Sequence, residues 1–480
     1  MDLKKRLFQH FGFTSFREGQ EEVITALLSG QDTLAVLPTG TGKSLCYQYV
    51  GYVLEGTVLV VSPLLSLMED QVRQLQSQGE GRVTVFNSTL SYEEKRYILE
   101  HFSEYNYVFI SPESLVKEQV VKTLQRSRLA LFVIDEAHCV SQWGVDFRPE
   151  YVKIKNVLEN LDYPLTLALT ATASDEVKKE IISELFNKNS SIKEVLHSVN
   201  RKNILMIVEK TVEKEQLVFD YLNKMNAKGI IYCSARKTTE YLSSEINRTG
   251  NFAAAFYHGG LTAAERSKIQ QQFIDNELDV LCATNAFGMG IDKSDIRFVI
   301  HFDCPGSLES YVQEIGRAGR DGLPAAAVLL YQPGDEYIHQ YFQGEVRTEL
   351  QGLEMMLKNG KADSAAQQEQ LSEIQQKWLA GYLEGSYSLE QLSERLHKKN
   401  NERYAQLQQM LAFIQTSDCR RKVILNYFSE KQEKETETWC CDNCGLEENW
   451  STKLGITKNT VRLEANLSWQ EILIRLFKDD

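Results

Sequence analysis

DTLAVLPTGTGKS, residues 32–44, decides how this chain begins to fold. The apolar run before Pro38 predicts a buried strand, and the residues after Lys43 predict a helix. Between them, Gly40 and Gly42 let backbone N–H groups curl around phosphates, with Thr39 and Thr41 in the same loop. Lys43 is expected to reach the β- and γ-phosphates, and Ser44 to bind Mg²⁺. Leu37 breaks the strict G-x-x-x-x-G-K-[ST] pattern, so an ordinary glycine-rich turn is the alternative to a nucleotide site.

Apolar runs alternate with helical patterns around this segment, and each run ends in a polar or small-residue turn. This alternation predicts a parallel sheet covered by helices on both faces. Further strands are predicted at 57–63, 107–112, 129–136 and 165–172. The pattern then recurs after a polar stretch, 187–203, that we interpret as a linker. The second set of strands is predicted at 228–235, 252–259, 279–286, 297–303 and 325–332.

The chain becomes helical and rich in Gln and Glu after the second set of strands. Residues 379–396 are expected to form helix, turn and helix, with Ser388 and Gln391 as a capping box. A third helix is predicted at 403–415, and three short helices would make a helix-turn-helix module. No cluster of Lys or Arg marks a DNA-reading face, so packing against the following cysteines is favoured over DNA binding.

The sequence therefore predicts an α/β protein with two tandem parallel-sheet lobes and a mainly helical, cysteine-containing C-terminal subdomain. The expected domains are 1–203, 204–343, 344–450 and a short tail, 451–480. In the tail, residues 468–477 are expected to form one amphipathic helix.

Composition and charge narrow the class of protein. The chain has 480 residues, is 42% apolar and carries a net charge of −13. We find no apolar stretch long enough to span a membrane and no secretory leader, and so expect an intracellular protein. The negative charge excludes a wholly basic nucleic-acid coat, but a nucleic-acid groove needs only a local positive potential.

Two acids and two arginines complete a candidate phosphoryl-transfer site. Asp135 and Glu136 end a predicted strand, where an Asp holds the Mg²⁺ shell and Glu136 is expected to polarise the attacking water. Arg317 and Arg320 lie three residues apart on a predicted helix, and thus on one face, where they would stabilise charge on the γ-phosphate. Because these arginines belong to the second lobe, the nucleotide is expected between the lobes.

Four of the nine cysteines fall within 26 residues, at Cys419, Cys440, Cys441 and Cys444. Clustered cysteines in an intracellular chain suggest metal, and four thiolates suit a structural Zn²⁺ with no open position. The alternative is a C-x-x-C redox pair with two buried cysteines.

Several motifs follow one another along the chain: FGFTSFREGQ, PTGTGKS, SPLLSLMEDQ, FISPESL, DEAHCVSQWGVDFRPEY, LTATA, YHGGL, ATNAFGMGIDKSDIRFVIH and QEIGRAGRDG. In this order they resemble the RecQ family of DNA helicases. The motifs cover residues 11–322, and some family members share the C-C-D-N-C arrangement at 440–444. The resemblance implies two RecA-like lobes, a zinc subdomain, Mg-ATP as fuel and 3′→5′ DNA unwinding.

The resemblance also assigns roles to residues outside the phosphate loop. Phe13 and Arg17 would sandwich the adenine, and Gln20 would hydrogen-bond its edge, although the family usually has Tyr at the position of Phe13. Read without the family, that segment is only a capped helix start. The FGMGID stretch would bring Gly290 and Asp292 close to the nucleotide.

The segment after the DEAH run corresponds to the family's aromatic-rich loop, which senses DNA and licenses ATP hydrolysis. Trp143 and Phe147 would offer stacking faces to unpaired bases, and Arg148 would meet a phosphate or the ATP. The alternative is that the aromatics only fill the gap between lobes. The remaining residues assigned to DNA coupling and binding are His138, Gln142, Ser62, Ser111, Ser234, Arg236, His258 and Thr284.

We expect an ATP-dependent 3′→5′ DNA helicase of DNA repair or recombination, with ATP, Mg²⁺ and Zn²⁺ as cofactors. Its expected substrate is single-stranded and partially duplex DNA, with single-strand-binding protein as a candidate partner. We expect a monomer in the cytoplasm, associated with the nucleoid. The tail after Cys444 is too short for a family winged helix, so a translocase with weak unwinding is one alternative. An RNA helicase of the broader superfamily is the other.

Overall fold

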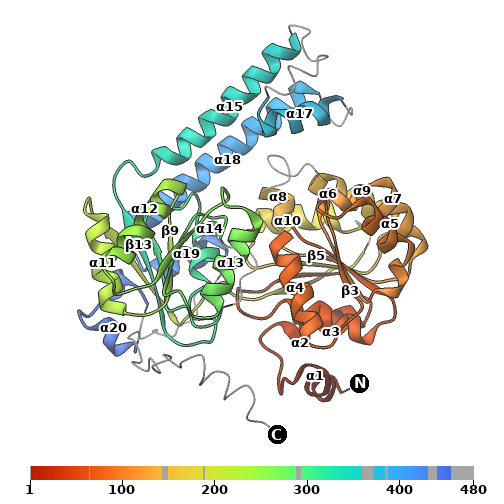
Figure 1. Cartoon of the computed structure of the whole chain (residues 1–480), viewed down its shortest axis with the longest axis horizontal. Helices are drawn as coiled ribbons and strands as arrows, with labels where there is room; N and C mark the ends of the chain where they lie inside the picture. Colours follow the sequence, from red (N-terminus) through yellow and green to blue (C-terminus); the bar gives the residue numbers. More distant parts are fainter. Residues whose placement is uncertain are drawn as a thin grey trace, which may run out of the picture.

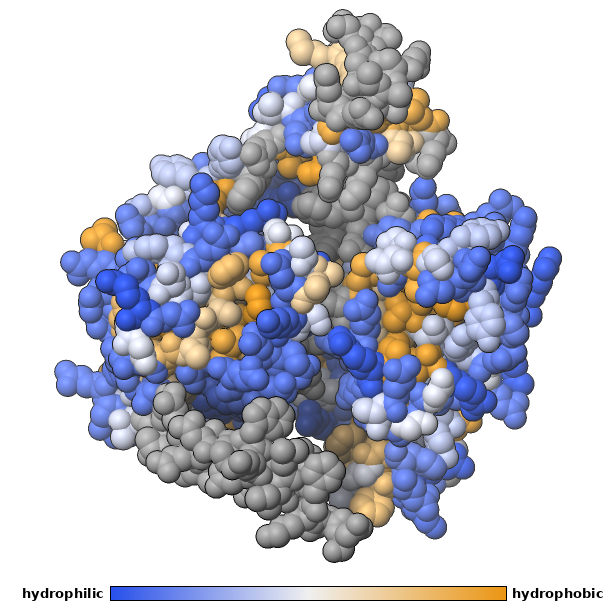
Figure 2. Space-filling view, in the orientation of Figure 1, coloured by the Kyte–Doolittle hydropathy of each residue, from blue (hydrophilic) through white to orange (hydrophobic). Residues whose placement is uncertain are grey.

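The computed structural model describes residues 2–63, 65–142, 150–187, 190–287, 293–358, 371–383, 388–430 and 440–455. Two α/β lobes lie side by side, and a helical arm projects from the second (Figure 1). The space-filling view shows mainly hydrophilic side chains on this face and a hollow between the lobes (Figure 2). Within the described ranges, we find no helix both long and apolar enough to cross a membrane.

The first lobe is built on a seven-stranded, entirely parallel sheet in the order β3-β4-β2-β5-β6-β1-β7. Its strands are β1 (Thr33–Val36), β2 (Thr57–Val61), β3 (Val83–Phe86), β4 (Tyr107–Ile110), β5 (Leu129–Ile134), β6 (Thr166–Thr170) and β7 (Lys193–Leu196). Alternate residues of one strand point to opposite faces of the sheet. Because successive residues of the central strands are buried, both faces of the sheet are covered. Leu34 and Val36 pack in one apolar cluster, whereas Ala35 between them packs in the other.

Helices cover both faces of this sheet. One face carries α1 (Leu3–Phe11), α2 (Gln20–Leu28), α3 (Ser44–Val53) and α4 (Leu65–Ser77). The other carries α5 (Tyr92–Glu100), the turn η1 (Phe102–Glu104), α6 (Pro112–Leu115), α7 (Glu118–Arg126), α8 (Cys139–Gln142), α9 (Glu150–Asn160) and α10 (Asp175–Leu185).

The second lobe repeats this design with a six-stranded parallel sheet in the order β10-β11-β9-β12-β13-β8. Its strands are β8 (Ile204–Lys210), β9 (Gly229–Tyr232), β10 (Ala254–Tyr257), β11 (Val280–Ala283), β12 (Phe298–His301) and β13 (Ala325–Tyr331). Its helices are α11 (Lys214–Met225), α12 (Arg236–Arg248), α13 (Ala263–Ile274) and α14 (Leu308–Ile315).

The C-terminal region is mainly helical and begins with the arm. The arm consists of α15 (Tyr337–Lys358), α17 (Glu373–Leu383) and α18 (Leu389–Gln415), and it has an apolar core of its own around Leu353 and Trp378. The chain then returns to the second lobe through α19 (Arg420–Tyr427), the turn η2 (Asp442–Cys444) and α20 (Trp450–Lys453). Two RecA-like parallel-sheet lobes and a helical, cysteine-bearing region agree with the predicted fold class.

All ten predicted strands are present, but three others were missed. β3 is short and only partly buried, and β8 directly follows the supposed linker. The linker prediction for 187–203 was wrong in part, because β7 lies inside it and pairs with β1 at the edge of the sheet. Three of its four residues are exposed, so β7 lacks the apolar run that marks a central strand.

The predicted three-helix module in the C-terminal region was also wrong. The capping box of Ser388 and Gln391 is present, but the helix it starts continues unbroken to Gln415. The stretch 397–402 contains no Gly or Pro to end a helix, so the two predicted helices are one. The predicted tail helix, 468–477, lies outside the described residues.

Candidate functional site

Most of the predicted site residues that the structure describes share one structural property. In both sheets they follow the carboxyl ends of parallel strands, where ligands of open α/β sheets bind. The phosphate loop follows β1, and the Asp135–Glu136 pair follows β5. β6 lies between these two strands in the sheet, so its end, at Thr170, lies between the loop and the acids.

The phosphate loop has the backbone that its sequence predicts. Gly40 and Gly42 have φ angles of 85° and 71°, in the left-handed region that glycine adopts without strain. α3 begins at Ser44, so its free N–H groups face the loop. A cavity of about 260 Å³ opens here, lined by residues of both lobes. Its lining includes Phe13, Arg17, Gln20, Thr39, Gly40, Gly42, Lys43, Ser44, Asp135, Glu136, Gln313, Arg317 and Arg320.

The segment before α2 braces the phosphate loop. The Gln20 amide donates to the carbonyls of Thr41 and Gly42, at 2.7 and 2.9 Å, and its oxygen accepts from the backbone N–H of Arg17. Arg17 Nη1 donates to the Gly40 carbonyl at 2.5 Å. Gln20 would have to exchange these bonds to contact an adenine edge. Phe13 is 52% exposed at the mouth of the cavity, where its ring face is available to a base.

Glu136 is buried and Asp135 partly buried, and their pKa values shift in opposite directions. Burial, and then the charge of Glu136, raise the pKa of Asp135 to about 6. Burial acts on Glu136 as well, but the charge of Lys43 and other nearby cations outweighs it and lowers the pKa of Glu136. Glu136 has a left-handed φ of 48°, uncommon for a residue with a side chain. The lowered pKa favours the ionised carboxylate.

His138 connects the acids to β6. Its Nδ1 lies 3.0 Å from the Thr170 hydroxyl oxygen and 3.3 Å from Glu136 Oε2. The Thr170 hydroxyl donates to the Thr172 carbonyl, so it accepts from a proton on Nδ1. Burial lowers the pKa of His138, which favours the neutral ring. His138 therefore links the acid pair to the LTATA segment rather than pointing into solvent.

Arg317 and Arg320 reach the nucleotide cavity, but the prediction that they share a helix face was wrong. α14 ends at Ile315, and both arginines lie in the following turn, whose Gly319 has a φ of 57°. The turn touches the phosphate loop: a Cβ on Gly40 would lie 3.0 Å from Cγ of Arg320. The cavity therefore brings together Lys43 and Ser44 from one lobe and two arginines from the other.

The residues assigned to DNA binding also follow strand ends. Ser62 follows β2, Ser111 follows β4, Ser234 follows β9, His258 follows β10 and Thr284 follows β11, while Arg236 begins α12. Arg236 is exposed, whereas Ser62, Ser111, His258 and Thr284 are buried. The Ser234 N–H donates to Asp303, and His258 Nε2 lies 2.9 Å from Glu240, so these two are held by their own lobe.

Several predicted residues fall outside the described part of the chain. These are Trp143, Phe147, Arg148, Gly290 and Asp292, together with the side chain of Gln142. Their assigned roles stay predictions.

The four clustered cysteines converge on one point. Their Sγ atoms all lie within 4.8 Å of one another, with 3.3 Å between Cys419 and Cys440 and 3.5 Å between Cys441 and Cys444. Four thiolates about 2.3 Å from a tetrahedral Zn²⁺ stand roughly 3.8 Å apart, so the cluster fits zinc. Hydrogen bonds, first from the Cys440 thiol and also from the Arg420 N–H, lower the pKa of Cys441 to about 5. A redox pair with two remote cysteines does not fit this convergence.

The cysteine module docks on the second lobe beside the inter-lobe linker. Cys441 makes a parallel bridge with Met206 at the edge of β8. Arg420 donates to both carboxylate oxygens of Asp442, at 2.5 and 2.8 Å, and the carboxylate also accepts from the N–H of Val208. The module is therefore bound to the edge strand by backbone and charged contacts.

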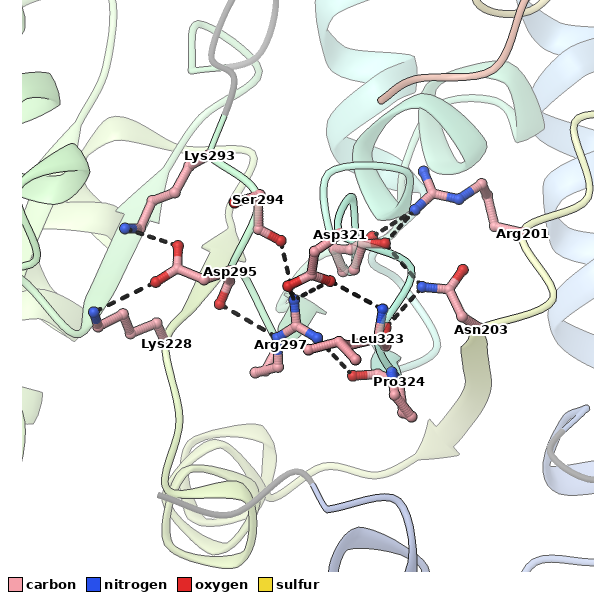
Figure 3. A network of polar contacts seen from close by, with 12 residues as sticks. Arg201, Asn203, Lys228, Lys293, Ser294, Asp295, Arg297, Asp321, Leu323 and Pro324 are labelled. Atoms are coloured by element: carbon pink, nitrogen blue, oxygen red, sulfur yellow. Dashed lines mark hydrogen bonds and ion pairs between the residues drawn. The ribbon is translucent and has the colours of Figure 1, made fainter. Parts of the chain in front are cut away.

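Sequence analysis missed the residues that hold the arginine-bearing turn, which Figure 3 shows. From the linker, Arg201 and Asn203 donate to carbonyls of the turn. From the second lobe, Nη2 of Arg297 donates to both carboxylate oxygens of Asp321, at 2.7 and 2.6 Å. No local signal marks Arg201, because its partners are backbone carbonyls more than a hundred residues away.

Comparison with known proteins decides the family. The DEAD/DEAH box helicase model matches residues 17–180, the helicase conserved C-terminal domain 209–322, and RecQ zinc-binding 383–445. The chain is 41% identical to the probable ATP-dependent DNA helicase RecS of Bacillus subtilis (strain 168), covering 99% of this chain and 98% of RecS. The chain belongs to the RecQ family of DNA helicases. This RecQ-family chain is also 37% identical to the ATP-dependent DNA helicase RecQ of Haemophilus influenzae. The match covers 91% of this chain and 62% of that protein.

The chain thus spans less than two thirds of that RecQ relative. The fold is shared with the Mycobacterium smegmatis helicase Lhr, whose structure was solved with ssDNA and AMP-PNP. The TM-score is 0.57 at 22% identity, covering 69% of this chain and 47% of Lhr. Membership in the RecQ family implies ATP and Mg²⁺ as cofactors, and the zinc-binding match together with the four converging cysteines supports Zn²⁺.

Proposed function

We propose that this RecQ-family protein moves 3′→5′ along single-stranded DNA and unwinds duplex ahead of it, in DNA repair or recombination. One observation carries the mechanism: the nucleotide cavity is lined by the phosphate loop of one lobe and the arginines of the other. ATP in that cavity would contact the phosphate loop of one lobe and the arginines of the other. Hydrolysis removes the γ-phosphate and with it the contact between the lobes. Closing and opening then alternate the grip of each lobe on the strand.

Within this cycle, each group has a role matched to its position. Lys43 and the loop N–H groups hold the triphosphate. Ser44 and Asp135 would hold Mg²⁺, which would neutralise phosphate charge. Glu136 orients the attacking water. Arg317 and Arg320 stabilise the charge that develops on the γ-phosphate. The adenine base is proposed to stack on Phe13 and on the guanidinium of Arg17. Gln20 would exchange its bonds to the phosphate loop for bonds to the edge of the base. Gly290 and Asp292 are proposed as further nucleotide contacts.

The DNA path is proposed to run over the strand ends that carry Ser62 and Ser111 in one lobe and Ser234, Arg236, His258 and Thr284 in the other. Hydroxyls and backbone N–H groups at such ends suit phosphate contacts that are independent of base sequence. Trp143, Phe147 and Arg148 are proposed to sense bound DNA. His138 would relay that signal, since it already joins the acid pair to Thr170.

The decisive experiment compares steady-state ATP hydrolysis without nucleic acid, with single-stranded DNA, and with single-stranded RNA of equal length. Stimulation by DNA alone supports the proposal, and equal stimulation by RNA favours an RNA helicase. Duplexes with a 3′ or a 5′ single-stranded tail then test polarity, and only the 3′-tailed duplex is expected to unwind. Hydrolysis without strand separation would favour a translocase with weak unwinding.

We further propose that the protein works as a monomer on single-stranded and partially duplex DNA in the cytoplasm, associated with the nucleoid. Single-strand-binding protein is the proposed partner. Light scattering at micromolar concentration checks the oligomeric state, and a fluorescent fusion checks the location. A stable dimer, or a fusion that avoids the nucleoid, would contradict these proposals.

A further inference from the structure

Arg201 stands in the short linker between β7 of the first lobe and β8 of the second. Its guanidinium donates four hydrogen bonds to backbone carbonyls in two different lobes. Nη1 reaches Thr39 at 2.8 Å and Gly316 at 3.0 Å, while Nη2 reaches Ala318 at 3.2 Å and Gly319 at 2.7 Å. One side chain thus joins the phosphate loop to the turn that carries Arg317 and Arg320.

The Thr39 hydroxyl also donates directly to the Gly316 carbonyl, at 2.8 Å. Two further supports of that turn, Asn203 of the linker and Arg297 of the second lobe, do not reach the first lobe. Asn203 donates to the carbonyls of Gly319 and Leu323, and Arg297 grips Asp321 and the Pro324 carbonyl (Figure 3). These bonds hold the shape of the turn but do not set its distance from the nucleotide. The Arg201 bonds to the carbonyls of Thr39 and Gly316 set the distance between the turn and the phosphate loop, because the two carbonyls belong to different lobes.

The C-terminal module in turn holds Arg201 in place. Arg421, two residues after Cys419, is only 5% exposed and lies against the linker. Its Nη1 donates to the Arg201 carbonyl at 3.0 Å and to Asn200 Oδ1 at 2.6 Å, and its Nη2 donates to the Ile204 carbonyl at 2.8 Å. The linker is therefore held by Arg421, which lies two residues from the proposed zinc ligand Cys419.

A second contact from the module secures the start of the linker. The Glu430 carboxylate accepts from the N–H of Val199 at 3.0 Å and from the Ser198 hydroxyl. Arg421 in the first turn of α19 and Glu430, three residues after its end, thus both contact the segment that carries Arg201. These contacts restrain the linker, so the position of the cysteine module determines the position of the Arg201 guanidinium.

We propose that Arg201 is a positioning residue for ATP hydrolysis: it sets the distance between the phosphate loop and the arginine-bearing turn, and the zinc module fixes it through Arg421. This inference rests on the ATP-driven cycle proposed above and adds its regulation by the zinc module. Arginine suits the task because its planar fork spans several carbonyls, whereas a lysine offers a single charged point. Burial, and then the charge of Arg320, lower the pKa of Arg201 to about 10, so it remains a cation at neutral pH.

The test measures kcat and the KM for ATP, with saturating single-stranded DNA, in Arg201→Ala, Arg201→Lys, Arg421→Ala and the double alanine variant. A displacement of catalytic groups by about an ångström costs on the order of 100-fold in rate. We expect Arg201→Ala to lower kcat by roughly 10- to 100-fold, because Arg317 and Arg320 act mainly in the transition state. The KM for ATP should change by less than about threefold, since Lys43 and the loop remain.

The companion variants separate positioning from general damage to the fold. Arg201→Lys should recover part of kcat, and Arg421→Ala should lower kcat while zinc content stays at that of the parent protein. If both arginines act through one chain of contacts, the double variant should be no slower than Arg201→Ala alone. The matched control is Arg248→Ala at the far end of α12, whose side chain is 79% exposed.

Two outcomes would overturn the inference. One is an Arg201→Ala protein whose kcat stays within about twofold of the parent. The other is a double variant whose loss is the product of the two single losses, which would mean that the arginines act separately. Should Arg201→Ala unfold, Arg201→Lys decides by the same split between kcat and KM. Failure of the proposed function looks different, because the parent protein itself would then show no DNA-stimulated hydrolysis.

Discussion

The Thr39 hydroxyl of the first lobe donates a 2.8 Å hydrogen bond to the Gly316 carbonyl of the second. Two segments 277 residues apart thus meet where the nucleotide cavity closes. Gly316 has no side chain, and a Cβ built there would lie 2.2 Å from the Thr39 hydroxyl oxygen. The contact between the lobes therefore needs a glycine at position 316 as well as the hydrogen bond from Thr39.

Gly316→Ala tests this closure. The added methyl should keep the arginine-bearing turn away from Thr39 and lower DNA-stimulated kcat by on the order of 10- to 100-fold. Nucleotide affinity, measured with a fluorescent ATP analogue, should change much less, because the loop and Lys43 are untouched. Gly344→Ala is the control: a Cβ there meets nothing within 4 Å, and alanine favours the helix α15. A Gly316→Ala enzyme with parental kcat would show that the lobes need not meet at this point.

Trp143→Ala tests the sensing role proposed for the aromatic loop. The variant should still bind ATP but lose stimulation by single-stranded DNA. Stacking on an aromatic side chain contributes about 1–3 kcal/mol per base, so DNA binding should weaken roughly 5- to 150-fold. Hydrolysis rates with and without DNA, together with DNA affinity from fluorescence anisotropy, provide the measurement. Undiminished stimulation would mean that Trp143 only fills space.

Zinc should be bound at about one ion per chain and should stabilise the fold. Cys441→Ser, at the most buried ligand, is expected to lose most of the metal and to lower both Tm and DNA-stimulated hydrolysis. Cys282→Ala, in β11 of the second sheet, should keep its zinc. Elemental analysis and thermal unfolding report both effects. A folded parent protein that contains no zinc would refute the metal site.

Lys214→Met should destabilise the second lobe near the base of the arm. Lys214 is buried, donates to Asp335 at 2.6 Å and to the Phe302 carbonyl at 2.7 Å, and lies 3.8 Å from Asp303. Removing it leaves two acids without their cation, at a cost of about 3–5 kcal/mol in the free energy of unfolding. Lys268→Met, on the exposed side of α13, should change it by no more than about 0.5 kcal/mol. Equal urea midpoints for the two variants would contradict this account.

Local patterns in the sequence identified a large part of this molecule correctly. The ten predicted strands are apolar runs of the right length, and the glycines of the phosphate loop adopt the left-handed φ they were expected to need. The capping box at Ser388 formed as predicted. The errors have two sources: β7 is an exposed edge strand without an apolar run, and α18 was divided in two although residues 397–402 contain no Gly or Pro that would end a helix.

The sequence by itself determined which chemical groups this protein has: a phosphate loop, a pair of acids, two arginines after a helix, and four thiols. Side-chain type, spacing and periodicity encode these features within a few residues. Only the tertiary structure decided how they are joined, above all that Arg201 spans Thr39 and the Gly316–Gly319 turn while Arg421 holds it from behind. The reason is physical: these bonds end on backbone carbonyls, which are the same at every residue, so no pattern of side chains reveals which carbonyl an arginine will meet.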